Sequence, residues 1–245
     1  ADNIYTPDQN TQIRQAQMEL AAAMADLGRE TGEERYTLSA QKVAAHFSKR
    51  QIGPDFLFNA ALANLHAHLA MASVNDSDRE EYLQKAVDRL KFGVLPAMYE
   101  SGQYKGMWID PVTQRLQNRF RLISFMVTVY NALDENAMFR HRLKDAINMS
   151  FSAILKQYEE NKGIQIGNEY ADMMCALSDS GIKMELPDYL QIWHVRARNF
   201  ALADIAYNQN GFLTRPYPIM CMVKTAIVDP DSENPADADS QKEEE

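Results

Sequence analysis

The chain has 245 residues, of which 46% are hydrophobic and 24% are charged, a composition typical of a water-soluble globular protein with a sizeable core. Its net charge of −9 comes mainly from residues 229–245, where eight acidic residues face a single lysine and leave the rest of the chain at −2. The body therefore has no basic excess for binding nucleic acid, and no apolar run approaches the roughly 18 residues of a membrane-spanning helix.

The first residues and the two cysteines bear on the compartment. The sequence begins Ala-Asp-Asn without a methionine, which we interpret as the product of signal-peptide cleavage, although trimming for expression would give the same start. This interpretation predicts a periplasmic or secreted protein. Cys175 and Cys221 could pair in an oxidising compartment, but Cys175 lies in an apolar helical pattern and we expect a buried free thiol.

Helical patterns begin near the start of the chain. Thr6 followed by Pro7 and Asp8 predicts the start of a helix that runs to about Gly32. We expect a polar linker over residues 33–37, a short helix over 39–49, and an alanine-rich helix over 55–73 that is apolar on most sides. Residues 75–78 predict a turn and N-cap before an outer helix over 79–93 with one apolar stripe.

The stretch from Asp110 to Gly163 repeats this arrangement. Asp110 before Pro111 predicts the N-cap of an inner helix that is apolar on most of its circumference from Phe120 onward. An outer helix is expected over residues 136–161. An offset of 60 residues superimposes the two helical hairpins in pattern, which favours a weak internal repeat, although any two amphipathic hairpins can be aligned in this way.

The remaining chain departs from the pattern. A shorter helix is expected over residues 169–177 and a further helix over 189–207, then an irregular segment from Gly211 and a disordered acidic tail over 229–245. We therefore predict an all-α protein with a single domain over residues 1–228, built of antiparallel helical hairpins stacked in a curved array. The layout is similar to an α/α superhelix or a partial α/α toroid, and no motif assigns it to a family.

Three long connections follow even-numbered predicted helices and should gather at one end of the array: residues 99–110, 158–170 and 207–218. Each opens with tyrosine, contains glycine and carries further aromatic residues. We predict that their aromatic side chains line a groove for a peptide, a sugar or a partner helix. The alternative is that they fold back over the core. The candidates are Tyr104, Trp108, Tyr170, Phe212 and Tyr217.

Charged residues near these connections suggest weaker hypotheses. Asp110 and Glu169 could act as acid and base of a glycosidase, but both are also explained as helix-start residues. Arg115 and Arg119, four residues apart, would favour an anionic ligand if they faced the groove. The histidines lack metal-ligand spacing, and no phosphate loop or nucleophile motif is present, so neither a metal nor a cofactor is predicted.

Two functions remain open, and against both stands a purely structural subunit of a larger assembly. The favoured one is a non-catalytic helical repeat protein that binds a protein or peptide through its aromatic, loop-rich end. The alternative is a glycan-binding or glycan-active protein that uses Asp110 or Glu169.

Overall fold

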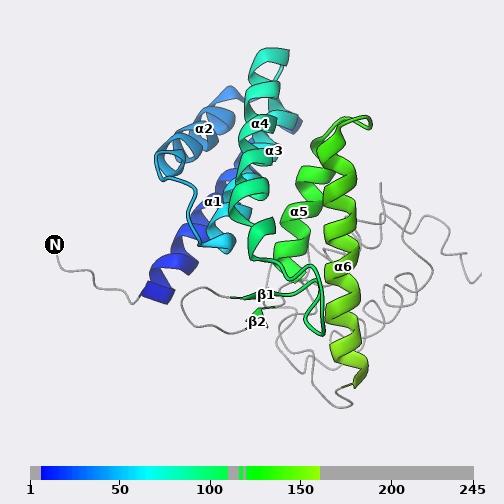
Figure 1. Cartoon of the computed structure of the whole chain (residues 1–245). Coiled ribbons are helices and arrows are strands. Elements are labelled where there is room, and N and C mark those ends of the chain that lie inside the picture. Colours follow the sequence, from blue (N-terminus) through cyan, green and yellow to red (C-terminus); the bar gives the residue numbers. More distant parts are fainter. Residues whose placement is uncertain (1–6, 110–115, 118–119, 161–245) are drawn as a thin grey trace, which may run out of the picture. The chain divides into compact units, whose positions relative to one another are not determined.

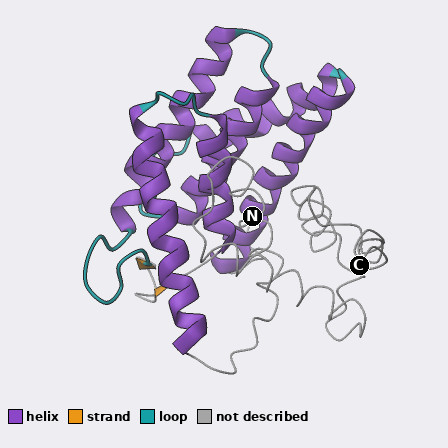
Figure 2. Cartoon of the chain, turned by 90° about the vertical axis from the view of Figure 1, so that its right-hand side faces the viewer, coloured by secondary structure: helices purple, strands orange, loops and turns teal. Residues whose placement is uncertain are grey.

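A computed structural model describes residues 7–109, 116–117 and 120–160 of the chain. These residues belong to the first of the two units into which the chain divides, Ala1–Ile164 and Gln165–Glu245. Helices dominate the described part (Figures 1 and 2). They are α1 (Pro7–Thr31), α2 (Glu34–Ser48), α3 (Phe56–Ala72), α4 (Asp76–Gly93), α5 (Phe120–Ala132) and α6 (Met138–Glu160). The predicted all-α class is confirmed for this part of the chain.

Predictions for the second half lie outside the described residues. They include the helices over residues 169–177 and 189–207, the irregular segment and the acidic tail. The single domain over residues 1–228 and the buried free thiol expected at Cys175 likewise stay predictions.

Helix α3 is the inner helix that its composition predicts. It begins after Asp55, whose carboxylate accepts a hydrogen bond from the Phe58 amide at 3.0 Å. Most of its residues are buried, polar ones included. It packs against α1, α2, α4 and α5, which explains how a helix that is apolar on nearly all sides avoids water.

Helix α4 begins after Asn75, whose side-chain oxygen accepts from the Ser77 amide at 2.8 Å, so the predicted N-cap cluster is confirmed. The helix buries Ala86 and Leu90 and keeps its charged residues mostly outside. Within the described part, α1 packs with α2, α3 with α4 and α5 with α6, while α3 also touches α1 and α5. The internal repeat and the curved array stay predictions.

Two predicted boundaries were wrong. Helix α2 already begins at Glu34, so the linker after α1 is only Gly32 and Glu33, with Gly32 at a positive φ of 72°. Helix α5 begins at Phe120 rather than at Pro111. Leu116 and Gln117 instead form strand β2 (Leu116–Gln117), which pairs antiparallel with β1 (Trp108–Ile109).

The physical reason for the second error is the distribution of apolar residues. A helix over residues 111–119 would offer few apolar side chains to the core, whereas the ribbon pairs Trp108 with Gln117 and leaves the indole fully buried. Burial of the Trp108 side chain in the tertiary structure therefore outweighs the local signal by which Asp110 and Pro111 predict a helix start.

A buried polar cluster ties α4 to the end of α2 and the start of α3. The Arg89 guanidinium, on a residue only 7% exposed, donates to the Asn59 side-chain oxygen at 3.0 Å, to Arg50 O at 2.6 Å and to Ser48 O at 3.4 Å. The Asn59 amide nitrogen in turn donates to Gly53 O at 2.8 Å. Because the carbonyls at a helix C-terminus are partly negative, α2 stabilises this cation without a carboxylate.

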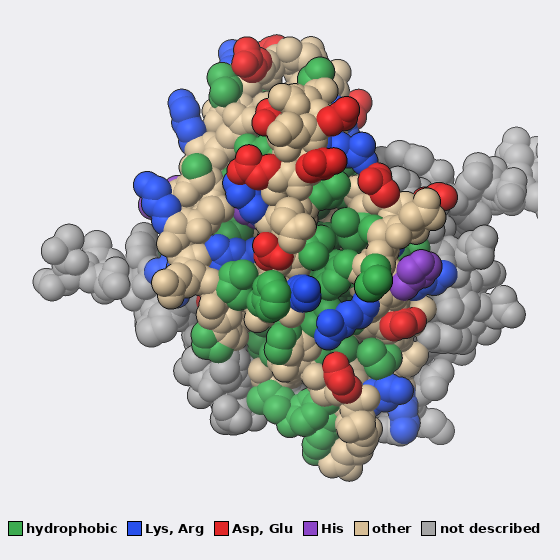
Figure 3. All heavy atoms as spheres, turned by 45° about the horizontal axis from the view of Figure 1, so that its top comes forward, with side chains coloured by type: hydrophobic (Ala, Val, Ile, Leu, Met, Phe, Trp, Pro, Cys, Tyr) green, Lys and Arg blue, Asp and Glu red, His purple; other side chains and the backbone are tan. Residues whose placement is uncertain are grey.

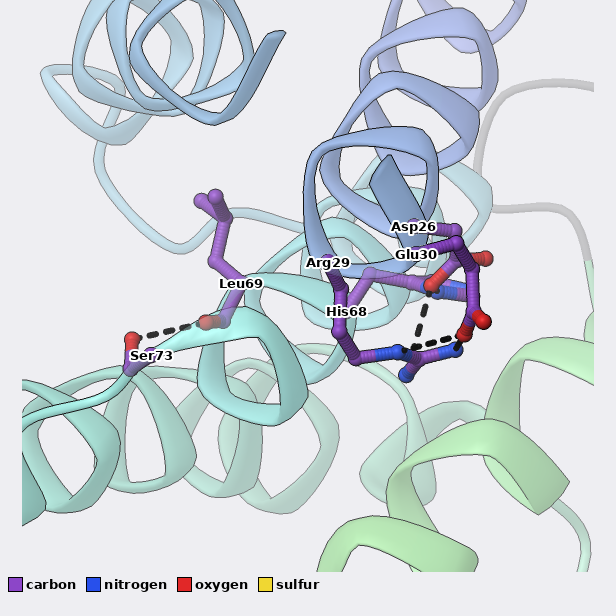
Figure 4. A network of polar contacts seen from close by, with 6 residues as sticks. All are labelled: Asp26, Arg29, Glu30, His68, Leu69 and Ser73. Carbon is purple, nitrogen blue, oxygen red and sulfur yellow. Dashed lines mark hydrogen bonds and ion pairs between the residues drawn. The ribbon is translucent and has the colours of Figure 1, made fainter. Parts of the chain in front are cut away.

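Helices α1 and α3 are linked by a second polar contact. His68 Nδ1 lies 2.8 Å from Asp26 Oδ1, and Asp26 also lies 3.7 Å from the guanidinium of Arg29, which binds Glu30 (Figure 4). Ser73, drawn in the same view, donates to the Leu69 carbonyl of its own helix. His68 is therefore engaged in joining two helices.

The surface shows no large patch of one charge on the face drawn in Figure 3. Acidic and basic side chains are interspersed over its upper part, and hydrophobic side chains gather below them. Among the described residues, none of the helices is both long enough and apolar enough to cross a lipid bilayer.

Candidate functional site

The connection from α4 to α5 is the first of the three long connections predicted from the sequence, and its first part is described. After α4 the chain forms the short 3₁₀ helix η1 (Leu95–Ala97) and then a loop that returns on itself. The Tyr99 amide donates to Met107 O at 2.9 Å, and the Gly106 amide donates to Tyr99 O at 2.8 Å. Met98 bridges Trp108 in the same ladder, so the loop has a defined closed shape.

Two glycines allow this loop to turn and to lie close to α6. Gly102 and Gly106 have φ values of 78° and 84°, where an L side chain is strained. A Cβ on Gly106 would lie 2.3 Å from the Met149 carbonyl oxygen, so the loop rests directly on the backbone of α6. At Gly102 a Cβ would meet no atom within 4 Å, so only the turn requires glycine there.

A cavity of about 700 Å³ lies between this loop and α6. Its size is within the range of small-ligand sites, and it can also take a few residues of a peptide. Both the loop and the helix contribute described residues to its wall. The lining residues are Gly102, Gln103, Tyr104, Lys105 and Met107 from the loop, and Asn148, Met149, Ser152, Ala153 and Lys156 from α6.

The chemistry of this wall is mixed. Methionine side chains supply adaptable apolar surface, and the amides of Gln103 and Asn148 can both donate and accept hydrogen bonds. Among the lining residues that the structure describes, lysine is the charged type, and none of them is an aspartate, a glutamate, a histidine or a cysteine. Such a wall can hold and orient a ligand, but within the described residues it offers no acid–base pair for hydrolysis.

Elsewhere in the described part, one serine lies beside a histidine. Ser48 Oγ and His66 Nε2 are 3.1 Å apart, and the His66 ring stacks on Tyr82. His66 is 1% exposed, and burial, together with the cations of Lys85 and Arg89, lowers its pKa from 6.5 to about 3. An imidazole of such low basicity is a poor general base for the serine, so the pair is a structural contact.

Two of the predicted site residues, Tyr104 and Trp108, are described, and they differ in exposure. Tyr104 lines the cavity, is 39% exposed and packs against Tyr99 with ring centroids 5.7 Å apart. Trp108 is 0% exposed, and its indole Nε1 has no hydrogen-bond partner among the described residues. Trp108 therefore folds back over the core, which is the alternative that the sequence left open. Its ring is not presented to a ligand.

The other predicted site residues lie outside the described residues: Asp110, Arg115, Arg119, Glu169, Tyr170, Phe212 and Tyr217. The structure does bear on the hypothesis for Arg115 and Arg119. The helix that was expected to place Arg115 and Arg119 on one face is not formed at Leu116 and Gln117, which are in β2, so the premise of that hypothesis was wrong.

Sequence reasoning missed the contribution of α6 to the cavity. Asn148, Ser152 and Lys156 recur at intervals of four residues, which places them on one face of the helix beside its apolar stripe. That spacing is a signal in the sequence, but it indicates a site only once the neighbouring loop is known.

In the part of the chain that the structure describes, no group of three or more histidine, cysteine, aspartate or glutamate side chains could hold a metal ion. Comparisons with known proteins found no family model, no curated protein and no solved structure that matches the chain. The function must therefore be argued from the geometry.

Proposed function

We propose that this chain is a non-catalytic helical protein that binds a segment of a protein or peptide partner in the cavity between the Gly102–Met107 loop and α6. The cavity is the observation that carries the proposal. It lies at a connection that the sequence had marked as functional, and the exposed Tyr104 ring is part of its wall.

The shape of the site supports binding of an extended segment. Backbone hydrogen bonds and the Gly106 contact with α6 fix the loop before any ligand arrives, which lowers the entropy that binding must overcome. Amide and hydroxyl groups of the wall can pair with a peptide backbone, while Met107 and Met149 can adapt to apolar side chains.

The proposal is tested by selecting peptides from a displayed random library against the full chain and measuring their dissociation constants by fluorescence polarisation. Ser152→Trp fills the cavity and Tyr104→Ala removes its exposed ring; each should weaken binding of the selected peptides about tenfold or more, as at other buried anchor positions. Tyr36→Ala, on α2, is the matched tyrosine control and should bind as the wild type does.

Either of two outcomes would contradict the proposal. One is a library from which no peptide is selected. The other is a set of peptides that bind the wild type and Ser152→Trp equally well.

A glycan ligand is the second candidate, because an exposed tyrosine beside amide side chains is also suited to a sugar ring. Catalysis on a glycan by Asp110 or Glu169 stays a hypothesis on residues outside the described part. A glycan array distinguishes the two: oligosaccharide binding that Tyr104→Ala abolishes, without peptide binding, would favour the sugar.

A further inference from the structure

Helix α1 has two opposite apolar faces. One face, with Met18, Ala21, Ala22 and Ala25, is buried in the core. The other consists of Ile13, Ala16, Leu20, Ala23 and Leu27, which recur at alternating intervals of three and four residues and are all exposed. At 100° per residue this second set lies on the side of the helix opposite the core. We call these five residues the α1 stripe.

The exposure of the α1 stripe is large. Ile13, Leu20 and Leu27, each seven residues from the next, are 39%, 64% and 43% exposed. Single exposed leucines are common on protein surfaces and need no explanation. A continuous seam in heptad spacing is different, because this is the pattern by which one helix packs against another helix.

We propose that the α1 stripe is a self-association surface, on which α1 packs antiparallel against α1 of a second copy of this chain. The stripe is complementary to itself in that direction. Running the second helix in reverse places Leu20 opposite Ala23 of the other copy and Leu27 opposite Ala16, so each leucine lies over an alanine, while Ile13 lies at the end of the overlap, opposite Glu30. A parallel pair would instead place alanine against alanine and leave gaps between the leucine layers.

The charges beside the stripe permit this pairing. Glu19 and Asp26 flank it on one side and would approach each other across the two-fold axis. Each already has a cationic neighbour in its own chain, since Glu19 pairs with Arg121 and Asp26 lies 3.7 Å from Arg29. Their mutual repulsion is therefore reduced.

The size of the contact sets the expected affinity. In this register the apolar overlap runs from Ala16 to Leu27, a length of about 16 Å. A single helix pair of this length buries less than the roughly 800 Å² per partner of a standard interface, so we expect a reversible dimer populated at tens of micromolar and above. This inference does not depend on the proposed peptide site.

Sedimentation velocity of the full chain from about 1 to 200 µM tests the proposal, a range chosen to bracket the expected affinity. The wild type should shift from monomer to dimer, and Leu20→Asp should remain monomeric at every concentration. Leu38→Asp is the matched control, because Leu38 is an exposed leucine on α2, 44% exposed and outside the stripe, and this variant should dimerise like the wild type.

Disulfide trapping tests the direction. In a background with Cys175→Ser and Cys221→Ser, checked by circular dichroism, Ala16→Cys mixed with Leu27→Cys should give a crosslinked heterodimer. Ala16→Cys alone should not crosslink, because antiparallel pairing separates the two copies of position 16 by about 16 Å along the axis. Self-crosslinking of Ala16→Cys would overturn the antiparallel arrangement.

Other occupants of the stripe give distinct results, each of which overturns the proposal. A wild type that stays monomeric, with a melting temperature that Leu20→Asp lowers by several degrees, would show that this chain's own residues cover the stripe. If the wild type stays monomeric and Leu20→Asp has the same melting temperature, the stripe would instead bind a different protein. Dimers that persist in Leu20→Asp would place the interface elsewhere.

Discussion

Two connections between helices are held in place by opposite means. Residues 49–55, between α2 and α3, lie over the buried Arg89 and Asn59, whose side chains donate to the carbonyls of Ser48, Arg50 and Gly53. Residues 99–107, between α4 and α5, are held by their own backbone hydrogen bonds and by the contact of Gly106 with the backbone of α6.

The difference shows what each connection can do. In the connection between α2 and α3, buried side chains donate hydrogen bonds to the carbonyls at the end of α2. These side chains fill the space beneath the connection. The second uses the absence of a side chain, so the chain comes close to α6 at one point and leaves a cavity beside it. A connection fixed by a close backbone contact can therefore frame a binding site, whereas one fixed by buried side chains is part of the core.

The largest expected effect comes from breaking the first connection. Arg89→Met keeps much of the side-chain volume but leaves the Asn59 oxygen and the Arg50 carbonyl without their donor. We expect a loss of about 3 kcal/mol in the free energy of unfolding, measured by urea titration. Arg79→Met is the control, because Arg79 forms an exposed pair with Asp134 and should cost about 0.5 kcal/mol or less. Equal losses for the two variants would refute the role given to Arg89.

The second connection is broken at Gly106. Gly106→Ala combines a strained φ with a Cβ too close to the Met149 carbonyl oxygen, so we expect a loss of about 2 to 3 kcal/mol in unfolding free energy. Gly102→Ala has the same strain without the clash and should cost about 1 kcal/mol. If the glycine contact frames the cavity, Gly106→Ala should also weaken ligand binding, while Gly102→Ala should affect it less. Indistinguishable variants would mean that the loop does not rest on α6.

A smaller effect sharpens the comparison through pH. The folded-state pKa of His66, about 3, lies below its unfolded value of 6.5, so between these values the unfolded chain binds one more proton. Stability should therefore fall as the pH falls below 6.5, and His66 should contribute a loss of about 2 kcal/mol between pH 7 and pH 5.

Urea titrations of the wild type and His66→Gln across this range give the measurement. The difference in stability between the two proteins should stay constant from pH 7 to pH 8 and then change in favour of the variant as the pH falls. A difference that does not depend on pH would show that His66 titrates normally in the folded protein.

The sequence predicted the helices wherever their burial could be read from local pattern. The apolar α3 and the N-cap cluster at Asn75 are examples, because periodicity and capping chemistry act over a few residues. The start of α5 could not be predicted in this way. The pairing of Leu116 and Gln117 with the strand of Trp108 is a non-local interaction that a local start signal does not reveal.

The candidate site was predictable in part. Its loop, with Tyr104, was marked by length and composition, but the α6 wall and the burial of Trp108 depend on packing. Arg89 was missed as a core residue although its position gave a signal, since it lies among Ala86, Leu90 and Gly93 on the buried side of α4. Charged residues on an amphipathic helix are usually solvated, and it is the nearby end of α2 together with the Asn59 oxygen on α3 that makes burial of this one favourable.

The seating of Gly106 on the backbone of α6 also has a practical consequence for protein engineering. Although the connection after α4 is long, a tag or reporter domain inserted between residues 99 and 107 would have to lift the loop off the helix. The turn between α3 and α4, where Val74 is fully exposed, is the better place for such a graft.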